Sequence, residues 1–71
     1  MSNFGDTLAS LRRRSKLSQQ ELAEKLKVSR SAISMYESGR REPDYEALLN
    51  IADLFGVSVS SLFISLYALF I

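Results

Sequence analysis

Apolar residues recur at helical spacing along nearly the whole chain. Near the start, Phe4, Leu8 and Leu11 stand at positions i, i+4 and i+7, on one face of a helix that we expect to end near Ser15. The same spacing returns in three later stretches, Leu22–Leu26, Ala32–Tyr36 and Leu48–Phe55. This periodicity predicts an all-α fold.

Residues with helix-capping chemistry separate these stretches. Ser18 and Glu21 have the spacing of a capping box, in which the serine side chain accepts from the third amide of the helix and the glutamate reaches back to the serine amide. The other residues of the kinds that begin or end helices are Ser29, Gly39, Asp44, Gly56 and Ser58. The sequence therefore predicts four short helices and a fifth segment that opens at Ser58.

The second and third predicted helices are joined by only Lys27, Val28 and Ser29. So short a connection holds two helices at a wide angle, as in a helix-turn-helix. We expect Val28 to fill the corner between the helices and Ala23 to leave room where they cross. Short or basic side chains then occupy the outward positions of the third helix, which are Arg30, Ser31, Ser34 and Met35. Such a surface suits a helix that enters the DNA major groove by its N-terminal end.

Charge is distributed unevenly along the chain. The 71 residues carry a net charge of +1, yet all nine Lys and Arg lie between Arg12 and Arg41. With three Glu, that stretch has a net charge of +6, whereas residues 42–71 hold four acidic residues and no basic one. A basic middle and an acidic, apolar end indicate two faces with different partners.

The composition argues against catalysis and metal binding. The chain has no Cys and no His, so it has no disulfide, no thiolate or imidazole metal ligand and no histidine base. Its carboxylates fall on predicted caps and solvent faces, and it has no glycine-rich phosphate loop. We expect no enzymatic activity, no cofactor and no metal. The N-terminus has no apolar run of the kind found in signal peptides, and we expect a cytoplasmic protein.

Two longer blocks of the sequence are LSQQELAEKLKVSRSAISMYESGRREP, from Leu17 to Pro43, and ALLNIADLFGVS, from Ala47 to Ser58. Both blocks resemble the phage-repressor/Cro-type (XRE-like) helix-turn-helix family of bacterial and phage regulators. The resemblance covers roughly residues 4–63. It implies an all-α, five-helix domain like that of lambda repressor, which binds operator DNA, usually as a two-fold dimer.

The resemblance also implies roles for individual residues. Arg30 and Ser31 match the first base-reading positions, and Arg30 could contact a guanine with two hydrogen bonds, worth about 1–3 kcal/mol of discrimination. Ser34 and Met35 match later positions that face the groove, where Met35 is limited to apolar contacts. The positions that match phosphate contacts are Gln19, Arg40 and Arg41, and the position of Gln19 also matches one that buttresses the helix that reads the bases. Arg12 and Glu37 match a partly buried ion pair that links the first and third helices.

The sequence departs from the family pattern at two helix ends. Family members commonly have glycine where this chain has Lys16 and Lys27. Both positions should adopt the left-handed conformation, which costs a residue other than glycine on the order of 1 kcal/mol. A cation recovers part of this through the helix dipole. We expect Lys27 to add a phosphate contact as well.

The C-terminal extension is the segment that the family pattern does not explain. We expect the DNA-binding domain to span residues 1–63 and to end in the fifth helix, and residues 64–71 are apolar apart from Ser65. The extension could complete the core of its own chain, pair two chains or begin a membrane span, which needs about 20 apolar residues. We favour pairing, because a large apolar surface must be covered. The expected dimer contacts are Ile64, Leu66, Tyr67, Leu69, Phe70 and Ile71.

Together these patterns predict a sequence-specific DNA-binding transcriptional regulator. We expect a repressor that binds double-stranded DNA at a palindromic operator as a homodimer, without a small-molecule effector. Two alternatives remain at this point. One is a controller protein of a restriction–modification system, and the other is an antitoxin-like protein-interaction module that uses the same fold.

Overall fold

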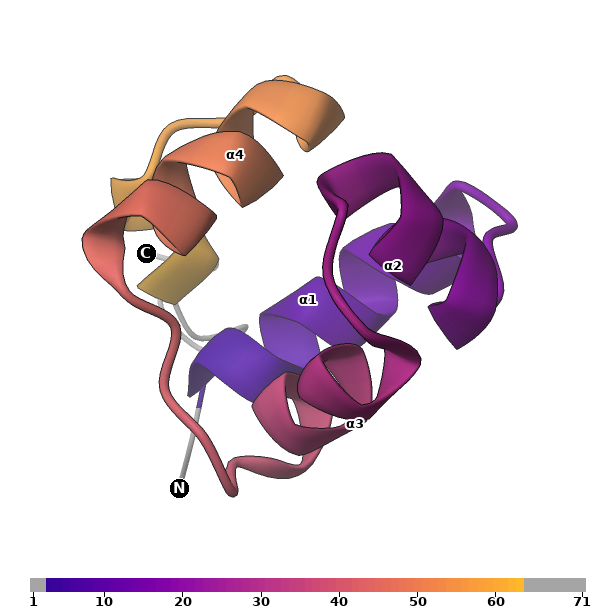
Figure 1. Cartoon of the computed structure of the whole chain (residues 1–71). Helices are drawn as coiled ribbons and strands as arrows, with labels where there is room; N and C mark the ends of the chain where they lie inside the picture. The colour runs from indigo at the N-terminus through magenta and orange to yellow at the C-terminus, as the bar shows by residue number, and fades with distance from the viewer. Residues whose placement is uncertain (1–2, 64–71) are drawn as a thin grey trace.

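The computed structural model describes residues 3–63, which form four α-helices and one 3-10 turn and contain no strand (Figure 1). In chain order the elements are α1 (Asn3–Arg14), α2 (Gln19–Leu26), α3 (Arg30–Ser38), α4 (Tyr45–Phe55) and η1 (Ser60–Phe63). α3 packs against both α1 and α2, and α4 lies across the molecule from α3. No helix in this range is long and apolar enough to cross a membrane. The all-α prediction is confirmed for the described residues.

The fifth helix expected from Ser58 is not α-helical within the described residues. The chain forms a 3-10 turn over Ser60–Phe63, in which the Ser61 and Leu62 amides donate to carbonyls three residues earlier. The Ser61 amide also donates to the Ser58 hydroxyl at 3.2 Å, as at a helix N-cap, and the Ser61 hydroxyl donates to the Ser58 carbonyl at 2.7 Å.

Each element contributes one fully buried side chain to a single core. These five residues are Leu8, Leu22, Ile33, Ile51 and Leu62. Leu26 and Leu48, which the helical spacing places toward the core, are only partly buried at its edge. Burial of a leucine or isoleucine contributes about 1.5–3 kcal/mol, so the five together hold all five elements to one centre.

Val28 lies at the corner between α2 and α3 and is 37% exposed. Its side chain lines a small hollow between the α2–α3 turn and α4, which is also lined by Leu26, Tyr36, Ala47, Asn50 and Ile51.

The predicted helix starts are confirmed in atomic detail. The Glu21 amide donates to the Ser18 side chain at 3.0 Å, and the Ser18 amide donates to the Glu21 carboxylate at 2.8 Å, which completes the capping box. Ser29 and Asp44 cap α3 and α4 through side-chain bonds of 3.0 and 2.8 Å. Each cap accepts a hydrogen bond from an amide that has no acceptor within the helix. As a result, α2 and α3 begin at fixed residues that are only a short turn apart.

The chain turns left-handed after each of the four α-helices. The φ angles are 58° at Lys16, 59° at Lys27, 78° at Gly39 and 67° at Gly56. The predicted positive φ of both lysines is therefore confirmed. At the end of α2 the Val28 amide donates to the Ala23 carbonyl at 3.0 Å, the bond that closes this type of helix end.

Gly5 allows α1 to approach the backbone of α3 closely. A Cβ atom at this position would lie 2.6 Å from the Glu37 carbonyl oxygen and 2.7 Å from that of Tyr36. Any other residue would therefore push α1 away from α3. The spacing of apolar residues gave no sign of this contact.

Candidate nucleic-acid interface

α3 presents a mostly polar face and buries the opposite one. Ala32, Ile33 and Tyr36 are buried, whereas Arg30, Ser31 and Ser34 are exposed and Met35 is half-buried. The inward residues fix the rotation of the helix about its axis. The structure therefore brings together the four residues predicted to read bases, with three of them fully available to solvent.

A bidentate ion pair anchors α3 to α1. Arg12 Nε lies 2.6 Å from Glu37 Oε2, and Arg12 Nη2 donates to Glu37 Oε1 at 3.1 Å. Arg12 Nη1 also donates to the Leu17 carbonyl at 2.9 Å, in the connection to α2. The hydrogen bonds to Glu37 raise the pKa of Arg12, an effect that burial opposes in part. The predicted pair of Arg12 and Glu37 is confirmed.

Gln19 supports α3, which is one of the two roles that the family resemblance implied for it. Its side-chain Nε2 donates to Glu37 Oε1 at 3.1 Å, so that α2 is anchored to the same carboxylate as α1. Glu37 thus accepts from two helices, and both hold α3 in place. The Gln19 backbone amide stands in the first turn of α2, where amides have no intrahelical acceptor and can bind a phosphate. The link from Gln19 to Glu37 could not be inferred from residue spacing.

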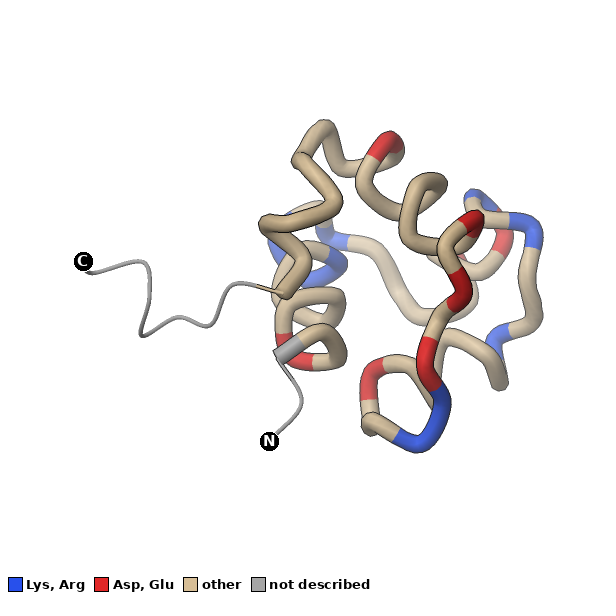
Figure 2. Tube along the Cα trace, turned by 90° about the vertical axis from the view of Figure 1, so that its left-hand side faces the viewer, with Lys and Arg blue, Asp and Glu red and all other residues tan. Residues whose placement is uncertain are grey.

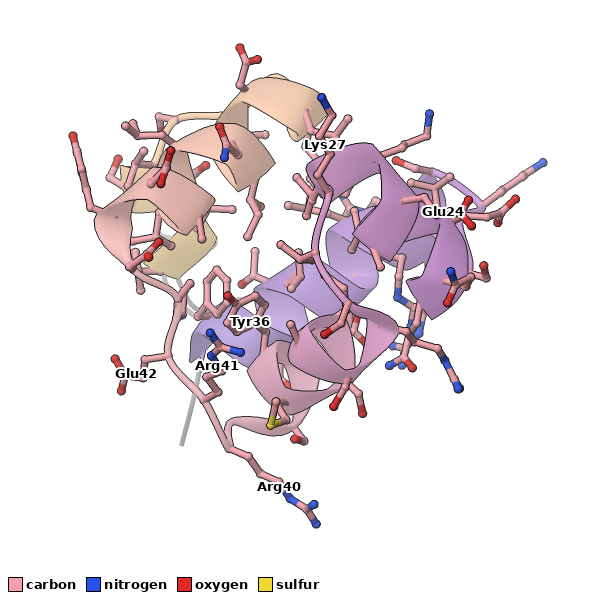
Figure 3. The ribbon with its side chains drawn as sticks, in the orientation of Figure 1. Glu24, Lys27, Tyr36, Arg40, Arg41 and Glu42 are labelled. Atoms are coloured by element: carbon pink, nitrogen blue, oxygen red, sulfur yellow. The ribbon has the colours of Figure 1, made fainter. Side chains whose placement is uncertain are left out.

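The loop after α3 carries two arginines that point in different directions. Its backbone is held where the Arg40 and Arg41 amides donate to the Met35 carbonyl, at 2.9 and 3.3 Å. Figure 3 shows the Arg40 side chain extending away from the body of the protein, whereas Arg41 folds back toward Tyr36. The Arg41 guanidinium carbon lies 5.6 Å from the centre of the Tyr36 ring.

Lys27 lies apart from this loop. It is exposed at the C-terminal end of α2, and Figure 3 places it at the opposite edge of the molecule from Arg40. The predicted phosphate contact of Lys27 stays a prediction. A single duplex would have to extend from the C-terminal end of α2 to the loop after α3 to reach both Lys27 and Arg40.

The sign of the charge changes along the loop that connects α3 to α4. Figure 2 shows two basic positions in this loop, followed by acidic positions that continue into α4. These acidic residues are Glu42, Asp44 and Glu46, and all three are exposed. The α3 side is therefore the part of the described chain that suits a polyanion, and the start of α4 is not.

The residues predicted to form a dimer interface lie outside the described residues. They are Ile64, Leu66, Tyr67, Leu69, Phe70 and Ile71. Within the described part, large apolar side chains are exposed on α4 and η1, including Leu49 at 43%, Leu54 at 38% and Phe63 at 49%.

The arrangement of α2, a three-residue turn and an exposed α3 is that of a helix-turn-helix domain. Residues 8–62 match the model of a helix-turn-helix protein family, a segment that contains α2, α3 and α4 entirely. The chain belongs to this helix-turn-helix family.

Relatives and solved structures agree with this membership. The chain is 44% identical over 59 residues to YqaE of Bacillus subtilis, an HTH-type transcriptional regulator by name. The match covers 83% of this chain and 51% of YqaE, so the chain spans about half the length of this relative.

Several solved structures share the fold at 30% sequence identity or more. The restriction–modification controller protein C.AhdI of Aeromonas hydrophila has a TM-score of 0.79 and 31% identity, covering 86% of this chain and 92% of that one. The DNA-binding domain of the P22 C2 repressor has a TM-score of 0.78 and 30% identity, covering 83% of this chain and 78% of that one.

Proposed function

We propose that this protein is a sequence-specific DNA-binding transcriptional regulator, and that it acts as a repressor. The observation that carries the proposal is the construction of α3. Its apolar side is buried, its exposed side carries Arg30, Ser31 and Ser34, and Glu37 ties it to both α1 and α2. A helix held this firmly can present side chains to base edges without losing much conformational freedom on binding.

In this proposal the exposed side of α3 enters the major groove. Arg30 reads guanine, Ser31 and Ser34 make shorter polar contacts, and Met35 contacts a thymine methyl group. Phosphates on either side of the groove are bound by the first-turn amide of Gln19 and by Arg40 and Arg41. Lys27 is a further phosphate ligand if the duplex reaches the far end of α2.

The proposed active species is a homodimer on a palindromic operator. Support comes from the apolar extension at residues 64–71 and from Phe63, which is half-exposed immediately before it. A second copy would cover these side chains and place a second α3 one helical turn along the DNA. Deletion of residues 64–71 should convert a dimer into a monomer in sedimentation equilibrium. A truncated protein that stays dimeric at the same concentration would contradict the pairing role.

The central experiment is selection of a binding site from random duplexes, followed by fluorescence anisotropy at several salt concentrations. We expect one preferred sequence, bound at least about 1,000-fold more tightly than random DNA. We also expect affinity for both to fall steeply with salt through counterion release. Failure to bind any duplex at low salt would contradict the DNA-binding function and favour a protein-interaction module.

A restriction–modification controller protein is the second candidate function. The likeness to C.AhdI favours it, because the aligned region covers 92% of that controller protein. The two candidates differ in the location of the preferred site. A site upstream of restriction and methyltransferase genes would support the controller, and a site at any other promoter would support a repressor of another kind.

A further inference from the structure

The two arginines of the loop after α3 carry the same charge but differ in how firmly their side chains are held. The Arg41 guanidinium lies over the Tyr36 ring at 5.6 Å, within the range of a cation–π contact. Within residues 3–63, Arg40 makes no such contact and no ion pair, and its side chain extends outward (Figure 3). Arg41 is therefore held by the Tyr36 side chain of α3, and Arg40 is not.

The ring beneath Arg41 is a rigid platform. Tyr36 is 5% exposed, and the edge of one ring meets the face of the other where it contacts Phe4, with centres 6.2 Å apart and planes at 79°. Phe4 packs in turn against Phe63, at 5.8 Å between centres. Rings from α3, α1 and η1 support one another, so Tyr36 cannot turn away without opening the core.

The contact with Tyr36 leaves the Arg41 N–H donors without a carboxylate partner. Arg41 is exposed and makes no ion pair among the described residues. A phosphate accepts two arginine N–H donors side by side. An arginine held over a ring loses less rotamer freedom when it binds a phosphate.

We infer that Tyr36 is a positioning residue, which orients Arg41 for a DNA phosphate and makes Arg41 the stronger of the two loop contacts. The inference rests on the proposed DNA-binding function and adds to it a division of roles within the loop. Tyr36 itself touches no DNA. It acts through Arg41 alone, and this distinguishes its role from general support of the fold.

A double-mutant cycle tests the inference, with Arg40 as the matched comparison. The variants are Arg40→Ala, Arg41→Ala, Tyr36→Leu, and Tyr36→Leu combined with each arginine change. Affinity for the selected operator is measured by anisotropy over a salt series. Each arginine change should reduce the salt slope by about one unit, but Arg41→Ala should weaken binding several-fold more than Arg40→Ala.

The combined variants decide the question. In the Arg41→Ala background, Tyr36→Leu should weaken binding no further. In the Arg40→Ala background, Tyr36→Leu should weaken binding by the same factor as in the parent. If the effect of Tyr36→Leu is the same in both arginine backgrounds, Tyr36 does not act through Arg41 and the inference is wrong. Parent protein that binds no duplex at low salt would instead contradict the proposed function itself.

A second pair of variants avoids any change in the core. Arg41→Lys and Arg40→Lys both keep the charge, but lysine lacks the planar fork that stacks and binds phosphate at once. We expect Arg41→Lys to weaken binding several-fold at unchanged salt slope, and Arg40→Lys to have little effect. Tyr36→Phe keeps the ring and should bind like the parent. Equal losses for the two lysine variants would overturn the inference.

Discussion

The surfaces of α3 and α4 are built in opposite ways on helices of similar length. Both helices bury an apolar side, but α3 exposes Arg30, Ser31 and Ser34, whereas α4 exposes Leu49 and Leu54. α3 can meet a polyanion without burying apolar groups against it. The α4 surface suits contact with another protein, since large apolar side chains gain most when they leave water.

The two helices also differ in what holds them. α3 is tied to α1 and α2 through one carboxylate that accepts from Arg12 and Gln19. In residues 3–63, no side-chain hydrogen bond joins α4 to another helix, and its attachment is apolar through Ile51 and its neighbours. Polar bonds are directional, so they fix the position of α3 more narrowly than apolar packing fixes α4.

The largest difference between the two helices should appear when a carboxylate is removed from each. Glu37→Ala leaves the guanidinium of Arg12 with 13% of its side chain exposed and no ion partner. We expect this to lower the free energy of unfolding by about 3 kcal/mol. Glu46→Ala on α4 is the matched control, and it should change stability by less than about 0.5 kcal/mol, because Glu46 is exposed. Urea unfolding measures both, and similar losses would show that the Glu37 network does not anchor α3.

The second prediction concerns reading of DNA by α3. Arg30→Ala should weaken binding to the selected operator by about 1–3 kcal/mol and relax the preference at one base position. Binding to random duplex should weaken far less, because non-specific affinity comes from phosphate contacts. Anisotropy with both duplexes makes the comparison. A uniform loss on both would reassign Arg30 from the base-reading residues to the phosphate ligands.

Local chemistry made the helix ends predictable. The caps at Ser18, Ser29 and Asp44 depend on residues within one turn, and the lysines at left-handed positions follow from helix-end geometry. The pair of Arg12 and Glu37 spans 25 residues and came from family resemblance, not from spacing.

Some contacts between elements could not be predicted from residue spacing. The close approach at Gly5 and the contact of Arg41 with Tyr36 depend on how two elements pack in space, whereas the bond from Gln19 to Glu37 matches a role that came from the family resemblance. Residue spacing after Ser58 also did not distinguish the observed 3-10 turn from an α-helix. The spacing of apolar residues predicts which side of a helix is buried, but it does not predict which residues that side contacts.

The third prediction compares the end of α2 with the end of α4. Lys27→Gly should stabilise the protein by up to about 1 kcal/mol, since it removes a left-handed lysine at φ 59°. Gly56→Ala should destabilise by about the same amount through φ alone, because an added Cβ would meet nothing within 4 Å. Thermal unfolding tests both changes. Lys27→Gly and Lys27→Ala that bind DNA like the parent at low salt would show that Lys27 makes no phosphate contact.

The smallest effect is a pH dependence at the start of α2. The hydrogen bond from the Ser18 amide, assisted by the Ser18 hydroxyl, holds the pKa of Glu21 below its ordinary value of 4.5. A carboxyl whose pKa is lower in the folded state stabilises the fold at higher pH. That contribution is complete above the unfolded pKa and is lost as pH falls through the folded pKa.

Glu21→Gln removes this titration and keeps the size of the side chain. The parent should therefore be more stable than Glu21→Gln at neutral pH, with a gap that narrows as pH falls below the ordinary pKa of glutamate. Because the side chain is exposed, the gap should be small and is best measured by urea unfolding over a pH series. A difference in stability that stays constant with pH would mean that the charge of Glu21 does not contribute to the capping box at α2. The fixed start of α2, and with it the placement of Gln19 beside Glu37, would then depend on the Ser18 side chain alone.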